Sequence, residues 1–101
     1  MKMYTNESQT AKLIELGFEK PKNRLVKQRF DRSTSSWIVV GEEGGYSIGE
    51  LIEMLDGVSE LEITRFGSGW EAYDELRAFT SEELIDALYD MIIMLKEVGV
   101  I

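Results

Sequence analysis

The side chains that could do chemistry in this sequence are carboxylates, lysines and hydroxyls, because its 101 residues include no histidine and no cysteine. Histidine is the commonest general base, and histidine and cysteine are the main ligands of zinc, copper and iron. Serine–lysine and paired-carboxylate chemistry stay open, but acidic residues such as Glu82 and Glu83 at an expected helix start are also what the helix dipole favours. We therefore expect a protein that is not an enzyme and that holds no metal and no cofactor.

A glycine-rich segment, "GEEGGYS" (41–47), precedes an expected helix and raises the question of phosphate binding. It lacks the Gly-Lys-Ser/Thr ending of a P-loop, and Glu42 and Glu43 would repel a phosphate. The regular acidic spacing of a calcium loop is also missing. We interpret this segment as a turn between a strand and a helix.

Basic residues are concentrated in one strip, "KPKNRLVKQRFDR" (20–32), which holds six Lys/Arg and one Asp. Residues 33–101 hold three Lys/Arg and fifteen Asp/Glu, and the whole chain carries a net charge of −8. If 24–31 is a strand, Val26 and Phe30 share the face expected to be buried, and Lys27 and Arg29 stand on the exposed face. Lys27 and Arg29 are therefore candidate partner-contact residues.

Three interpretations of the strip stay open. Its charges could solvate a strand and discourage edge pairing, contact a protein, or contact nucleic-acid phosphates. The acidic remainder argues against binding to a polyanion. That remainder could instead imitate a nucleic-acid backbone as an inhibitor, since four acidic residues share one face of the last helix: Glu82, Asp86, Asp90 and Glu97. An ordinary solvated helix face has the same pattern.

Three helices are predicted from start signals, each a Ser, Thr or Asn followed three residues later by Glu or Gln. These pairs are Asn6 with Gln9, Ser47 with Glu50, and Thr80 with Glu83. The first helix is expected over 7–16, the second from Ser47 to Leu55, and the last over 81–97. Glycines at the end of each helix suit the left-handed stop position: Gly17, Gly57 and Gly99.

Two hairpins are predicted between these helices, one over 24–31 and 36–41 and one around "GSG", with Phe66 opposite Trp70. Trp37, Val39 and Trp70 are expected to face the core. The order αββαββα indicates an α+β fold, with an antiparallel sheet and three helices layered on one face. The length fits a single domain, 1–101.

The last helix is apolar over about 220° of its circumference, more than a one-sided surface helix needs. A core stripe is expected from Leu84, Leu88, Met91, Ile92 and Leu95. Ile93 is left on the polar arc, where nothing within the chain is expected to cover it. A flank of this helix could therefore serve self-association or partner binding, and Ile93 is the candidate residue.

Three motifs, "SQTAKLIELGF", "YSIGELIEML" and "ELIDALYDMIIMLKEVGVI", together resemble a group of small proteins of unknown function from gut anaerobic bacteria and their prophages. The motifs are helix caps and core positions. The resemblance implies a phage or mobile-element setting and carries no activity.

The functional prediction is a small non-catalytic protein-binding protein, interacting with an unidentified protein partner or with itself. No run of 18 apolar residues and no signal-peptide pattern occurs, so we expect a cytoplasmic protein without membrane contact. The alternatives are a nucleic-acid-associated accessory protein that uses strip 20–32, and an acidic nucleic-acid mimic. Nucleic acid is not the partner that we expect.

Overall fold

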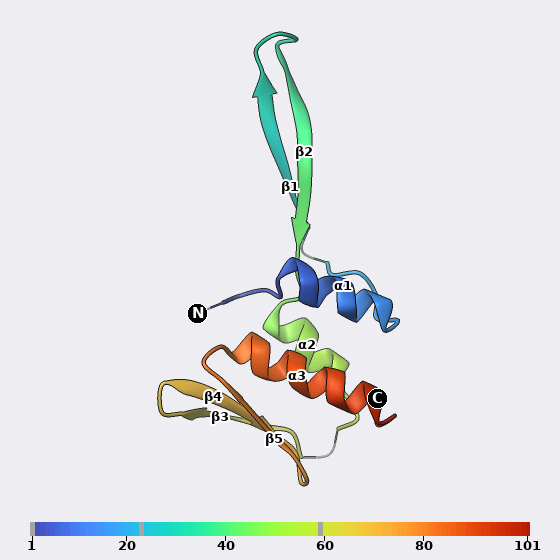
Figure 1. Ribbon diagram of the computed structural model, residues 1–101, viewed down its shortest axis with the longest axis vertical. Coiled ribbons are helices and arrows are strands. Elements are labelled where there is room, and N and C mark those ends of the chain that lie inside the picture. Colours follow the sequence, from blue (N-terminus) through green and yellow to red (C-terminus); the bar gives the residue numbers. More distant parts are fainter. Residues whose placement is uncertain (1, 23, 59) are drawn as a thin grey trace.

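The computed structural model describes residues 2–22, 24–58 and 60–101, without the side chains of 24–27, 39–43 and 66 (Figure 1). It confirms the α+β class and the antiparallel pairing of the strands. The elements in chain order are α1 (Glu7–Glu15), β1 (Arg24–Asp31), β2 (Ser36–Gly44), α2 (Ile48–Met54), β3 (Glu62–Phe66), β4 (Gly69–Tyr73), β5 (Ala78–Ser81) and α3 (Leu84–Glu97).

The strands form two separate sheets where the sequence predicted one. Strands β3, β4 and β5 make a three-stranded sheet in that order, and α3 packs against β4 and β5. Helix α2 packs against α3, and α1 lies on the side away from the sheet (Figure 1). We call these elements and their connections the body. The three helices thus lie on one side of a small sheet, and only α3 packs broadly on it.

Strands β1 and β2 form a two-stranded hairpin that projects from the body (Figure 1). We call residues 24–44 the arm. The molecule measures 59 × 31 × 17 Å and has a radius of gyration of 16.7 Å, against about 13 Å for a compact domain of 100 residues. The arm meets the body where α1 contacts β2. The predicted strand positions are confirmed, but the hairpin has no core beneath it.

Both predicted capping boxes at α1 and α2 are confirmed. The Asn6 side chain accepts the N–H of Gln9 at 2.8 Å, and the Gln9 side chain accepts the N–H of Asn6 at 3.0 Å. Ser47 and Glu50 make the same reciprocal pair at α2. These bonds satisfy main-chain donors that a helix start leaves without partners, and they fix where each helix begins.

Helix α3 begins three residues later than predicted, because Ala78–Ser81 form strand β5. Thr80 pairs with Glu71 in the sheet and does not cap the helix. The residue at the N-cap position is Glu83, whose side chain makes no capping bond. A four-residue strand directly before a helix has too few residues for its alternation to be recognised in the sequence.

The β3–β4 hairpin is also one residue out of the predicted register. Phe66 pairs with Gly69 and Arg65 pairs with Trp70, so the turn has two residues. Gly67 has φ +57, in the left-handed region that two-residue hairpin turns require. The guanidinium of Arg65 lies 5.2 Å from the centroid of the Trp70 ring.

The core lies between α3, α2, α1 and the three-stranded sheet. The predicted α3 stripe is confirmed, since Leu88 and its fellow stripe residues are all buried. Trp70 is half-buried and packs against this core, as predicted. Ile93 is also half-buried and packs there, so the expectation that nothing covers it is wrong. The other core residues are Leu13, Tyr46, Leu51, Leu55, Ala72, Ile85 and Ala87.

Candidate functional site

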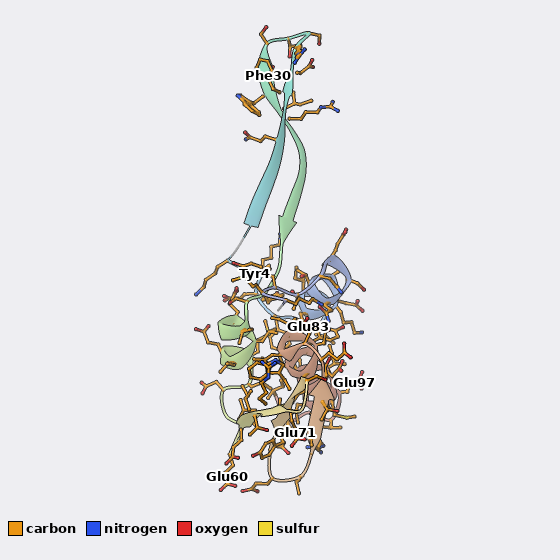
Figure 2. All side chains as sticks on the ribbon, turned by 90° about the vertical axis from the view of Figure 1, so that its left-hand side faces the viewer. Tyr4, Phe30, Glu60, Glu71, Glu83 and Glu97 are labelled. Carbon is orange, nitrogen blue, oxygen red and sulfur yellow. The ribbon has the colours of Figure 1, made fainter. Side chains whose placement is uncertain are left out.

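The main surface feature of the molecule is an aromatic pair near the far end of the arm. Phe30 on β1 and Trp37 on β2 are cross-strand partners. Their ring centroids lie 5.5 Å apart at an interplanar angle of 63°, an edge-to-face contact. Phe30 is 46% exposed and Trp37 is 66% exposed, and Figure 2 shows Phe30 far from the body. The prediction that both face the core is wrong, because the hairpin leaves the body.

The turn beyond this pair is held by side-chain hydrogen bonds. The Asp31 carboxylate accepts the main-chain N–H of Ser33 at 2.9 Å and its hydroxyl at 2.7 Å. The hydroxyls of Thr34 and Ser36 lie 2.8 Å apart. Bonds from Ser33 lower the pKa of Asp31, so this carboxylate stays charged at neutral pH. These hydrogen bonds fix the conformation of the turn next to the aromatic pair.

Arginines lie close to the aromatic pair in sequence. Arg29 is exposed on β1 and pairs with Ile38, on the face of the ribbon opposite to Phe30. Arg32 is exposed in the turn. The side chain of Lys27, the other predicted contact in the strip, lies outside the described residues. The strand pairing shifts by one residue between Lys27 and Gln28, and such a bulge strengthens the local twist.

The end of β2 is joined to the body through Gly45 and Tyr46. Thr5 donates its N–H to the carbonyl of Tyr46 at 3.0 Å, and Tyr46 donates its N–H to the Thr5 hydroxyl at 2.9 Å. The hydroxyls of Thr5 and Thr10 lie 2.7 Å apart in the interior. The Tyr46 hydroxyl donates to the carbonyl of Glu19. Burial, followed by the charge of Glu50, raises the pKa of this phenol.

The connection into β1 is also attached to the body. Pro21 is buried, and the N–H of Lys22 donates to the Glu50 carboxylate at 3.2 Å. Glu50 belongs to α2, so contacts to the body precede the arm as well as follow it. These contacts hold the base of the arm from both of its strands.

The structure does not bring the predicted contact residues together. Arg29 lies in the arm, whereas Ile93 lies on α3 and packs against the core of the body. Two apolar residues at the end of α3 are exposed: Met94, at 41%, and the C-cap residue Val98, at 52%. Their spacing of four residues puts both on one flank of the helix, but only the packing of the neighbouring elements shows that this flank stays uncovered.

The acidic residues in the row on α3 differ in their contacts. Asp86 accepts hydrogen bonds from the Lys2 ammonium and the Gln9 side chain, each at 2.8 Å. Burial by itself raises the pKa of Asp86, but these bonds and the charge of Lys2 outweigh it and lower the pKa. Partial burial of its carboxyl group, followed by the charge of Asp86, raises the pKa of Asp90. Glu97 is exposed near the end of the helix (Figure 2).

In the described part of the chain, no three or more Asp or Glu side chains gather as a metal ion would require. No helix within the same ranges is long and apolar enough to cross a bilayer. Comparison of the chain with family models, with curated proteins and with solved structures gave no match. The resemblance to small prophage-associated proteins therefore stays a prediction, and the arm is the feature on which a function can be proposed.

Proposed function

We propose that this chain is a small cytoplasmic, non-catalytic protein-binding protein of the accessory kind found in phages and mobile elements, and that the arm carries its contact surface. The observation that supports the proposal is the Phe30–Trp37 pair, exposed at the end of a hairpin that projects from the body. Large exposed apolar groups that lie together are typical of interaction sites.

The residue types at the end of the arm are those that contribute most to protein interfaces. Tryptophan and arginine are enriched among interface residues whose truncation weakens binding most. Removing apolar surface from water contributes about 25 cal/mol per Å², so about 100 Å² at the aromatic pair would contribute about 2.5 kcal/mol. Arg29 and Arg32 add hydrogen-bond donors that suit carboxylates of a partner.

The arm is preorganised for binding at its turn and at its base. Ordering a mobile loop on association opposes binding, and a segment already fixed in its bound shape avoids most of that cost. The Asp31 turn fixes one end of the arm, and contacts of Thr5 and Glu50 fix its base. An isolated two-stranded hairpin is marginally stable in water, so a partner that covers the arm would also stabilise it.

The lack of histidine and cysteine supports the non-catalytic part of the proposal. The body supplies no comparable group of exposed aromatic residues among those described. Its sheet turns a polar face to solvent, with Thr64, Glu71 and Thr80 in one cross-strand row. That face serves as the control surface for an experiment.

The test is site-specific photo-crosslinking in the native host. A photoreactive amino acid at Gln28, which shares the Phe30 face of β1, should crosslink to a discrete protein, and Trp37→Ser should abolish the product. The same probe at Thr64 on the sheet should give none. Products from Gln28 that disappear on nuclease treatment would favour the nucleic-acid-associated alternative. No product from Gln28 would show that the arm is not the contact surface.

A further inference from the structure

Helix α3 carries an apolar patch with an acidic border on its outer face. Met94 and Val98 are one turn apart and therefore neighbours on the helix surface, and both are exposed. Asp90 lies four residues before Met94 and Glu97 lies three residues after it, so both border Met94 on the helix surface; both residues are exposed. No ion pair is recorded for either carboxylate with any described residue, unlike Asp86, which is bonded to Lys2.

The end of the arm is complementary to this patch in both chemistry and charge. It offers two aromatic rings, Phe30 and Trp37, and thioether–aromatic contacts of the kind that Met94 can make are favourable. It also offers Arg32, exposed in the turn beyond the rings, whose guanidinium group suits carboxylates such as those that border the patch. The two complementary surfaces belong to the same chain.

We propose that the partner of the arm is a second copy of this chain: Phe30, Trp37 and Arg32 of each copy dock on Met94, Val98, Asp90 and Glu97 of the other. The inference rests on the proposed function and names its partner. The resulting dimer is two-fold symmetric, because each copy donates one arm and receives one. A reciprocal contact of this kind closes, whereas a one-way contact would continue into a chain.

The shape of the molecule fits this arrangement. Strands of eight and nine residues give an arm of about 25–30 Å, about half of the 59 Å long axis. Two copies placed side by side in opposite directions therefore bring each arm alongside the body of the other. An arm cannot reach the α3 of its own chain, since it points away from the body in both views (Figures 1 and 2).

The first test is the mass of the protein in solution, by light scattering and analytical ultracentrifugation over a concentration series. The wild type should reach twice the protomer mass of 11.5 kDa. Trp37→Ser in the arm and Met94→Ser on α3 should each weaken the dimer by at least about 30-fold, as expected for central interface residues. Circular dichroism should show both variants folded, because both side chains are exposed. Thr64→Ser on the sheet is the matched control and should leave the mass unchanged.

A charge exchange tests the pairing itself. The variant Arg32→Glu has an acidic turn, beside Asp31, and an acidic α3 patch, and Asp90→Lys/Glu97→Lys keeps the basic Arg32 at the end of the arm and has a basic patch. Each should be a monomer alone, because like charges would meet at both contacts. Their equimolar mixture should restore the dimer, because every arm then meets a patch of opposite charge.

A wild type that stays monomeric up to about 1 mM would overturn the dimer. So would a dimer that survives both Trp37→Ser and Met94→Ser, or masses that grow beyond two copies with concentration. The crosslinking at Gln28 separates this failure from that of the proposed function. A monomer that crosslinks from Gln28 to a different protein keeps the binding role and removes only the second copy as the partner.

Discussion

The phenol of Tyr46 donates a hydrogen bond to the main-chain carbonyl of Glu19, and this bond closes the base of the arm. Glu19 precedes β1 and Tyr46 follows β2, so the loop of chain between them contains the whole arm. Tyr46 is 1% exposed and belongs to the core cluster. The attachment of the arm is therefore part of the hydrophobic core of the body.

Removing this bond should destabilise the body. Tyr46→Phe leaves the ring in the core and the Glu19 carbonyl without its partner, and we expect a loss of about 1–2 kcal/mol in the free energy of unfolding. Urea denaturation followed by circular dichroism measures it. Tyr73→Phe is the matched control, because its hydroxyl bonds to Glu62 on the exposed face of the sheet; it should stay within about 0.5 kcal/mol. Equal losses in the two variants would contradict a special role for Tyr46.

A methyl group at Gly45 should disturb the same attachment. A Cβ there would lie 2.3 Å from the main-chain oxygen of Thr5, and Thr5 is held in place because its N–H donates to the Tyr46 carbonyl. Gly45→Ala should therefore cost at least about 1–3 kcal/mol, the usual range for overpacking. Gly49→Ala in α2 is the control with the opposite sign, because the nearest atom lies 3.9 Å away and alanine favours a helix by about 0.5–1 kcal/mol. Thermal melts should show a lower melting temperature than the wild type for Gly45→Ala and a higher one for Gly49→Ala.

Two substitutions in α3 should lower the free energy of unfolding by different amounts, because the two side chains are buried to different extents. Leu88 is fully buried in the core, so Leu88→Ala should cost about 2–5 kcal/mol. Ile93 is half-buried against the same core, so Ile93→Ser should cost less, about 1–2 kcal/mol. Chemical denaturation of both variants measures the difference. A neutral Ile93→Ser would show that this side chain is exposed in solution and available to a partner.

Two aspartates one turn apart on α3 should respond to pH in opposite directions. The lowered pKa of Asp86 means that its carboxylate stabilises the fold above the ordinary value of 3.8, and this contribution is lost as pH falls through the folded-state pKa. Asp86→Asn should thus lower stability at pH 7, by less than about 1 kcal/mol for a partly exposed ion pair. The effect of Asp86→Asn should shrink as pH falls from 3.8 through the folded-state pKa, because the carboxyl group is then protonated in the folded and in the unfolded chain.

The raised pKa of Asp90 gives its contribution to stability the opposite dependence on pH. The fold favours its protonated form, so the stabilising contribution is present below 3.8 and is lost as pH rises through the folded-state pKa. At a protein concentration low enough to keep the chain monomeric, Asp90→Asn should therefore raise the melting temperature at pH 7 and leave it nearly unchanged near pH 2. Melting curves of both variants between these values test the pair. A fall in stability at pH 7 for Asp90→Asn would reveal a partner for this carboxylate.

Local features of the fold could be predicted from the sequence because their causes are local. The capping boxes at Asn6 and Ser47 depend on side chains that bond to main chain three residues away. The apolar stripe of α3 depends on the period of the helix, and it is buried as expected. Strand β5 was missed, because four residues before a helix carry too little alternation.

The position of the first hairpin could not be predicted, and the candidate site depends on it. Alternation along β1 places Phe30 on one face of the strand, but the same pattern results whether that face meets a core or a partner. The burial of Trp37 was inferred from residue type, and that inference fails where the strand leaves the body. Arg29 was correctly expected on an exposed face, while its separation from Ile93 depends on tertiary structure that no local pattern contains.

The length of the arm has a consequence for the electric field around the molecule. Electrostatic interactions in water fall off over about 8 Å at physiological ionic strength, and the arm is about three times longer than that. The field felt near Arg29 and Arg32 is therefore set by the end of the arm and hardly by the acidic body, whose glutamates lie far below it in Figure 2. The net charge of −8 governs how the whole molecule migrates in an applied field. A surface that approaches the far end of the arm meets a cationic group.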